Sequence, residues 1–148
     1  LSSASWGNVL TTIPYVLIGA GIAYFFSKEL NALLLGEEMA ATLGVDVEST
    51  RLFLIGTASL MTAAAVSVSG LIGFVGLIIP HWIRLIIGPN HRMLIPMSAL
   101  SGMLLMVVAD TIARTVLSPM EIPIGIIMAL VGAPFFLYLL RRRRLEGK

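Results

Sequence analysis

One long uncharged stretch decides which class of protein this sequence can form. Residues 52–83 follow one another without a Lys, Arg, Asp or Glu, whereas about 20 apolar residues already suffice to cross a bilayer. The whole chain is 57% hydrophobic and only 12% charged, while a soluble domain has about 25% charged residues. The sequence therefore predicts an all-α integral membrane protein embedded in a lipid bilayer.

Polar and helix-breaking residues divide the chain into five expected transmembrane helices. Ser69-Gly70 interrupts the long uncharged stretch, Gly88-Pro89-Asn90 forms a turn after it, and Ser118-Pro119 separates the last two helices. The five helices are expected at residues 8–26, 52–68, 71–87, 93–117 and 122–140. The arginines that follow residue 140 are expected to end the fifth helix.

The segment of residues 70–92 is unusual for a membrane helix. Gly70, Gly73 and Gly76 recur every three residues, and we expect them to let a second backbone approach closely. Pro80 removes a helical hydrogen bond, and a histidine and an arginine follow it at membrane depth. Lipid tolerates such a segment only where it packs against protein or lines a wet path.

Residues 30–51 carry too many charges to cross a membrane. Gly36 is expected to begin a short helix with two glutamates in its first turn, and Gly44 is expected to end it. One side of this helix would show Met39, Ala40 and Leu43. Two interpretations remain open from the residues: an interfacial amphipathic loop, or an element on which a partner docks.

The positive charges choose the orientation of the five helices. If the C-terminus is cytoplasmic, nine of the ten Lys and Arg residues lie at the inner surface and only Arg114 lies outside. The opposite orientation would violate the positive-inside rule nine times. We therefore expect a multi-pass protein of the cytoplasmic membrane, with residues 30–51 and the turn at residues 88–92 facing the cytoplasm.

The sequence offers no constellation for catalysis. The absence of cysteine excludes disulfides and thiolate metal sites, and two histidines are too few for a metal site. We therefore expect no enzymatic activity, no metal and no cofactor, and nothing suggests binding to nucleic acid. Because the chain begins with Leu and lacks a basic segment before its first apolar stretch, we expect part of a longer protein without a signal peptide.

Asp110 and Arg114 are four residues apart, so on a helix they share one face and can pair. Either the two charges only neutralise each other near the outer end of the fourth helix, or Arg114 binds an acidic group that arrives from outside. The residues alone leave both interpretations open.

Three segments in the same order resemble the C-terminal half of the FecCD-type permeases. They read GEEMAATLGV, SGLIGFVGLIIPHWIRLIIGPNHRMLIP and ADTIARTVLSPMEIPIGIIMALVGAPFFLYLLRR. Members of this family are membrane subunits of ATP-binding-cassette (ABC) importers for iron–siderophores, haem and cobalamin. The resemblance covers the chain from about Trp6 onward. It implies a subunit of about ten transmembrane helices built from two related halves, with residues 1–148 forming the second half of one permease domain.

The resemblance also implies partners. Two such permeases, identical or different, would form a dimer around a central pathway. The dimer would sit on two ATPase subunits at the cytoplasmic side, and a substrate-binding protein would dock from outside.

Roles for single residues follow from the same resemblance. A segment at about residues 32–48 matches the cytoplasmic coupling helices that lie in a groove of the ATPase, and within it we expect coupling to rest on Gly36, Glu37, Ala40, Leu43 and Gly44. Arg114 matches an outward arginine that pairs with a glutamate of the binding protein in the cobalamin importer, which favours its docking role. The face that carries Gly125, Ile126, Ala129 and Ala133 would border the translocation path.

Two rival functions come from other classes. In an ion-coupled secondary transporter, Asp110 and His81 would carry protons, although such sites usually lie near the midplane on broken helices. A purely structural subunit would anchor a partner without moving a substrate. The sequence leaves open which of siderophore, haem or cobalamin an importer would carry.

Overall fold

In the computed structural model, residues 5–115 and 123–146 are described, with the side chains of 138–140 and 142–146 left aside. The described residues form helices without a strand. In chain order these are α1 (Trp6–Phe25), α2 (Ser27–Leu33), α3 (Glu37–Thr42), α4 (Val47–Ser69), α5 (Val75–Ile87), α6 (His91–Thr115) and α7 (Ile124–Glu146). The prediction of an all-helical protein is confirmed.

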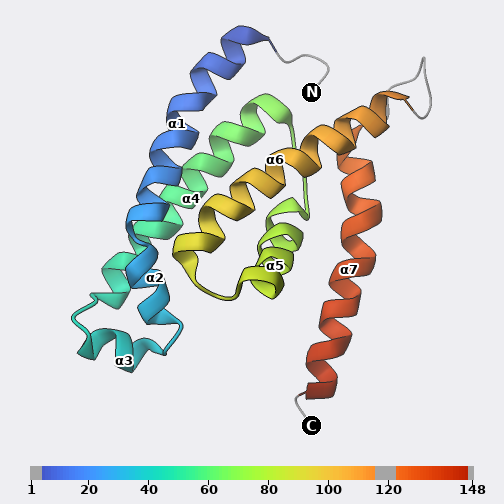
Figure 1. Ribbon diagram of the computed structural model, residues 1–148. Helices are drawn as coiled ribbons and strands as arrows, with labels where there is room; N and C mark the ends of the chain where they lie inside the picture. Colours follow the sequence, from blue (N-terminus) through green and yellow to red (C-terminus); the bar gives the residue numbers. More distant parts are fainter. Residues whose placement is uncertain (1–4, 116–122, 147–148) are drawn as a thin grey trace.

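The chain runs back and forth between two ends of the molecule (Figure 1). The start of α1, the end of α4 and the end of α6 lie at one end, while α2, α3 and the α5–α6 turn lie at the other. Helix α4 packs along α1, α5 packs along α6, and α7 contacts both α5 and α6. Two parts of the chain were predicted to face the cytoplasm, residues 30–51 and the turn at residues 88–92. They lie at the same end of the molecule.

Among the described residues, three helices are long and apolar enough to cross a membrane: α1, α4 and α6. Helix α5 is apolar but has only 13 residues, which span about 20 Å of a hydrocarbon core about 30 Å thick. The prediction of a helix from residue 71 is wrong, because Gly70 and Phe74 have φ of 75° and 67°, values that a right-handed helix excludes. Residues 70–74, before α5, adopt an irregular conformation.

Helix α7 continues farther than predicted. It runs to Glu146, because arginine is a good helix former and ends the apolar segment without ending the helix. The predicted break at Ser118-Pro119, and the adjoining ends of the fourth and fifth predicted helices, lie outside the described residues.

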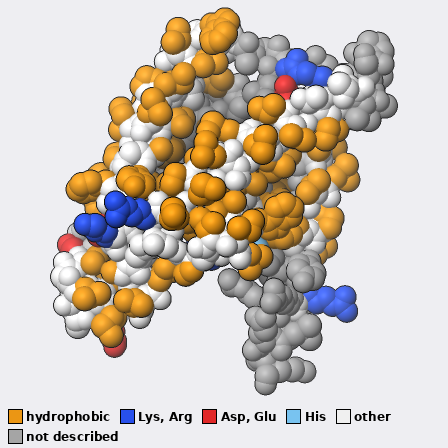
Figure 2. Space-filling view, viewed as in Figure 1, with side chains coloured by type: hydrophobic (Ala, Val, Ile, Leu, Met, Phe, Trp, Pro, Cys, Tyr) orange, Lys and Arg blue, Asp and Glu red, His pale blue; other side chains and the backbone are white. Residues whose placement is uncertain are grey.

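The described residues bury few side chains. One core cluster joins α6 to α7 through Ala109, Ala113, Ile124 and Met128. A second joins α5 to α6 through Ile79, Ile83 and Leu94. Hydrophobic side chains cover most of the face seen in Figure 2, as expected of helices whose surroundings are lipid or further membrane helices.

The described residues bring other side chains close to different glycines than the predicted ones. A Cβ atom added to Gly70, Gly73 or Gly76 would meet nothing within 4 Å among the described residues, so the close approach of a second backbone there stays a prediction. A Cβ atom on Gly19 of α1 would lie 2.2 Å from the side chain of Met61 in α4, and two glycines of α7 have close neighbours as well. A Cβ on Gly132 would lie 2.3 Å from the side chain of Phe74, and one on Gly125 would lie 3.3 Å from the carbonyl oxygen of Leu71.

Candidate functional site

The short helix α3 is fixed at both ends by glycine. Gly36 caps its N-terminus with φ of 105°, and Gly44 follows its C-cap with φ of 86°. The N–H of Val45 donates to the carbonyl of Ala40 at 3.0 Å, and that of Gly44 to the carbonyl of Ala41 at 2.9 Å. These two bonds form a Schellman motif. The predicted start and end of this helix are confirmed.

The two sides of α3 differ in exposure. Ala40 is fully buried, whereas Met39 and Leu43 are 53% and 62% exposed. The expectation that all three would appear on one side is wrong for Ala40, because α3 packs its small residue toward α2 and α4. The surface available to a partner therefore carries Met39 and Leu43, and Ala40 acts as the packing contact that holds α3 in place.

Polar contacts tie α3 to the start of α4. Glu37 forms an exposed ion pair with Arg51, and the N-cap Asp46 accepts a hydrogen bond from the N–H of Ser49 at 3.2 Å. Hydrogen bonds from the Ser49 side chain and backbone lower the pKa of the Asp46 carboxyl. An exposed ion pair contributes at most about 1 kcal/mol, so the cap and the glycine turns define the geometry more than Glu37 does.

Asn31 ties the same segment to the distant α5–α6 turn. Its Nδ2 donates to Oδ1 of Asn90 at 2.9 Å, and its Oδ1 accepts from the backbone N–H of His91 at 2.7 Å. The Nδ1 of His91 lies 3.0 Å from the same oxygen. Sequence reasoning missed Asn31. The sequence indicated only the turn that contains Asn90, which is the partner of Asn31. The Oδ1 of Asn90 also caps α6 by accepting a hydrogen bond from the N–H of Arg92 at 3.0 Å.

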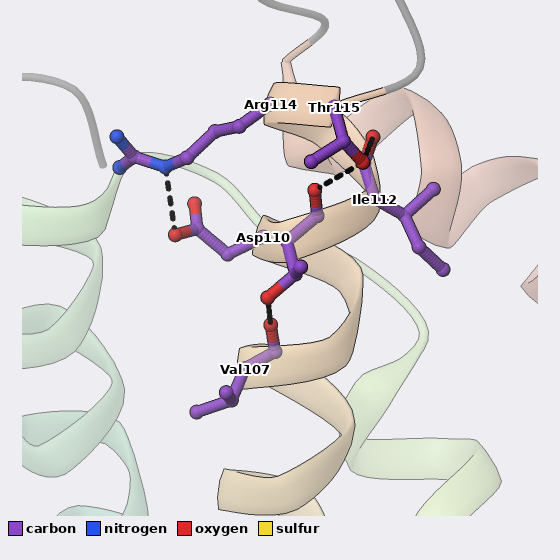
Figure 3. A network of polar contacts seen from close by, with 6 residues as sticks. Val107, Asp110, Ile112, Arg114 and Thr115 are labelled. Carbon is purple, nitrogen blue, oxygen red and sulfur yellow. Dashed lines mark hydrogen bonds and ion pairs between the residues drawn. The ribbon is translucent and has the colours of Figure 1, made fainter.

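At the opposite end of the molecule, Arg114 pairs with Asp110 as predicted. The Nε of Arg114 donates to Oδ2 of Asp110 at 2.9 Å, and Figure 3 shows both side chains extending from the same side of α6 and meeting beside the helix. The arginine side chain is 47% exposed and the aspartate side chain 29% exposed. The pair thus presents the guanidinium, more than the carboxylate, to a partner.

The four residues predicted to border a path do share one face of α7. They line a shallow groove of about 470 Å³ together with Leu130 and Pro134. The opposite face of α7 carries Met128, which is 2% exposed and packs in the core. The groove faces away from the described core.

The remaining ionisable side chains suggest no other chemistry. No group of three or more His, Asp or Glu residues gathers in the described part of the chain. The ring of His81 packs edge-on against Phe135 of α7 at 5.7 Å, a contact that suits a packing residue.

The sequence matches the FecCD transport family over residues 1–142. Similar curated proteins include the cobalamin import system permease protein BtuC of Halobacterium salinarum, which is 52% identical over 99% of this chain and 39% of its own length. The hemin transport system permease protein HmuU of Yersinia pestis is 42% identical over 97% of this chain and 43% of its own length. The chain thus spans about two fifths of the length of these relatives.

A solved structure shows the same fold. It is described as an inward-facing conformation of an ABC transporter of the metal-chelate type, and it superposes with a TM-score of 0.86 at 38% identity. The match covers 95% of this chain and 45% of that one.

Proposed function

The chain belongs to the FecCD transport family, and from this premise we propose that it forms the C-terminal half of the permease subunit of an ABC importer. The importer would carry an iron complex, either a siderophore complex or haem, or cobalamin across the cytoplasmic membrane into the cell. Its relatives include permease proteins of cobalamin import and of hemin transport, which supports this class of substrate and favours it over ion-coupled secondary transport.

The geometry of α3 is the main observation that supports a role in coupling ATP hydrolysis to transport. A six-residue helix is too short to be stable by itself in water, yet this one is fixed by two glycine turns, a buried alanine and a capped α4. Its exposed side offers Met39 and Leu43 to a partner. We infer that an ATPase subunit grips this side from the cytoplasm, and that closure of two ATPase subunits displaces α3 and α4 together.

The further partners follow from the two ends of the molecule. With α3 inside, the Arg114–Asp110 pair lies outside, where Arg114 would contact an acidic group of the substrate-binding protein. The groove on α7 that contains Gly125, Ile126 and Ala129 would border the path between two permease subunits, identical or different.

The test uses the complete permease that contains this chain, reconstituted in liposomes with its ATPase and its binding protein. ATP-dependent uptake of cobalamin, haem and a ferric siderophore is measured separately. Leu43→Glu places an unpaired charge on the surface proposed to be gripped, so uptake per ATP hydrolysed should fall at least about tenfold, the equivalent of about 1.4 kcal/mol. Leu85→Glu, which changes a similarly exposed leucine near the end of α5 and outside residues 32–48, is the matched control.

The outcomes separate the proposals. Uptake that needs no ATP would contradict the importer. If uptake needs ATP but both substitutions reduce it equally, the proposal of an importer is supported and the proposed role of Leu43 is contradicted.

A further inference from the structure

A pocket of about 440 Å³ lies where the end of α1, the start of α2 and the start of α6 meet. It belongs neither to the coupling surface of α3 nor to the groove on α7. Its lining residues are Gly21, Tyr24, Phe25, Ser27, Lys28, Glu29 and Arg92. The pocket lies at the end of the molecule that the positive charges place at the inner membrane surface.

Two cations from distant parts of the sequence line this pocket. Lys28 comes from the first turn of α2 and Arg92 from the first turn of α6, and both are exposed. Tyr24 of α1 lines the pocket beside these two cations. Basic pockets between membrane helices at the cytoplasmic side are typical binding sites for lipid headgroups.

A carboxylate adds a second requirement to the ligand. Glu29 also lines the pocket. A carboxylate offers only acceptors to a neighbouring ligand. A ligand that matches the whole pocket therefore combines a negative group for the two cations with a hydrogen-bond donor for Glu29.

The third feature is an apolar wall that leads from the pocket along α1. Phe25 is 74% exposed, and Leu17 and Ile18, two turns earlier, are 66% and 63% exposed. In Figure 2, Lys and Arg side chains at the α2 end of the visible face directly border hydrophobic surface. A ligand with a polar head and a long apolar tail fits this arrangement, whereas a small water-soluble anion uses only the charged part.

We propose that this pocket binds a bilayer phospholipid whose headgroup carries a phosphate and a separate hydrogen-bond donor, as in phosphatidylglycerol or phosphatidylethanolamine. Lys28 and Arg92 contact the phosphate oxygens. Glu29 accepts a hydrogen bond from a glycerol hydroxyl or from the ammonium group. The acyl chains lie along the exposed apolar face of α1. This inference requires only that the helices lie in a bilayer, and it does not depend on which substrate is transported.

The test measures which lipids stay bound to the complete permease. The protein is exchanged into nanodiscs with equal amounts of phosphatidylglycerol, phosphatidylethanolamine and phosphatidylcholine, and retained lipid is counted by native mass spectrometry after gentle delipidation. The first two lipids should be retained over phosphatidylcholine, whose quaternary ammonium cannot donate to Glu29. Lys28→Gln and Arg92→Gln should each weaken retention about fivefold, since one cation near the membrane surface contributes about 1 kcal/mol.

Two further variants sharpen the result. Glu29→Ala should remove the discrimination against phosphatidylcholine while phosphate binding remains. Arg84→Gln is the matched control, because this exposed cation of α5 lies at the same end of the molecule and does not line the pocket. Variants are compared only where each elutes as a single symmetric peak in size-exclusion chromatography.

Several outcomes would overturn the proposal. Equal retention of all three lipids would do so, as would an effect of Arg84→Gln equal to that of Arg92→Gln. Displacement of the lipid by inorganic phosphate at physiological concentration would assign the pocket to a soluble anion. Retention of no lipid by the complete permease would show that its other half covers the pocket.

Discussion

Replacing Gly132 with alanine tests whether contact between α7 and Phe74 sets the position of the last helix. A Cβ atom on Gly132 would lie 2.3 Å from both Cβ and Cγ of Phe74, whereas carbon atoms in contact are about 3.5–4.0 Å apart. Relief therefore requires a displacement of more than about 1 Å. Rotation of the ring does not provide it, because the Cβ of Phe74 moves only with its backbone, which is already left-handed at φ 67°.

The expected cost follows from two opposing effects. Adding a methyl group to a packed contact destabilises by about 1–3 kcal/mol, while alanine is favoured over glycine inside a helix by up to about 1 kcal/mol. We expect Gly132→Ala to lower the free energy of unfolding by about 1–2 kcal/mol. Gly102→Ala in α6 is the matched control, since its Cβ would meet nothing within 4 Å among the described residues. It should be neutral or stabilising.

The assay is a reversible detergent-unfolding titration of the complete permease followed by tryptophan fluorescence. The ring of Trp82 lies 6.0 Å from that of Phe135 in α7, so its emission reports on the contact between α5 and α7. A double-mutant cycle with Phe74→Gly isolates the contact. Gly132→Ala should cost less in the Phe74→Gly background than in the parent, because the clashing Cβ is absent there. Equal effects of the two Gly→Ala changes, or the same cost of Gly132→Ala in both backgrounds, would refute this reasoning.

Two further predictions concern the ends of the molecule. Arg114→Glu should weaken docking of the binding protein, and it should do so more strongly at low salt, because exposed charges are screened at high salt. The affinity is measured by surface plasmon resonance at low salt. An unchanged affinity would leave pairing with Asp110 as the role of Arg114. Asn31→Ala removes the acceptor of the His91 N–H and should cost about 1–3 kcal/mol of stability, measured in the same titration, together with a lower uptake per ATP. Asn31→Asp keeps that acceptor and should be milder, so equal losses for both variants would contradict the acceptor role.

The sequence predicted those parts of the fold that depend on local signals. Charged residues and helix-breaking turns mark most helix ends. Glycine adopts positive φ more readily than other residues, which is why Gly36 and Gly44 indicated the two ends of α3. The irregular segment before α5 was missed for the same local reason. Phe74 adopts a positive φ although it is not glycine, and its side chain packs against Gly132 on a helix more than 50 residues away, a contact that no local pattern indicates.

Sites that join distant segments were harder to predict. Asn31 and Asn90 are 59 residues apart, and nothing near either residue indicates the other. The orientation of Ala40 depends on α2 and α4, which both contact α3, so the six residues of α3 could not determine it. In contrast, Asp110 and Arg114 are one helical turn apart, and that spacing alone predicted their hydrogen bond.

The contacts of α3 determine how far a displacement of α3 can reach. On one side, the Schellman turn connects α3 to the capped start of α4, which packs on α1. On the other side, α2 carries Asn31, whose bonds to Asn90 and His91 reach the turn between α5 and α6. Helices α1 and α2 also pack directly on α6. A force on α3 therefore reaches the α5–α6 pair both through the hydrogen bonds of Asn31 and through the packing of α1 and α2 on α6, so Asn31→Ala should weaken the coupling between the two pairs without abolishing it.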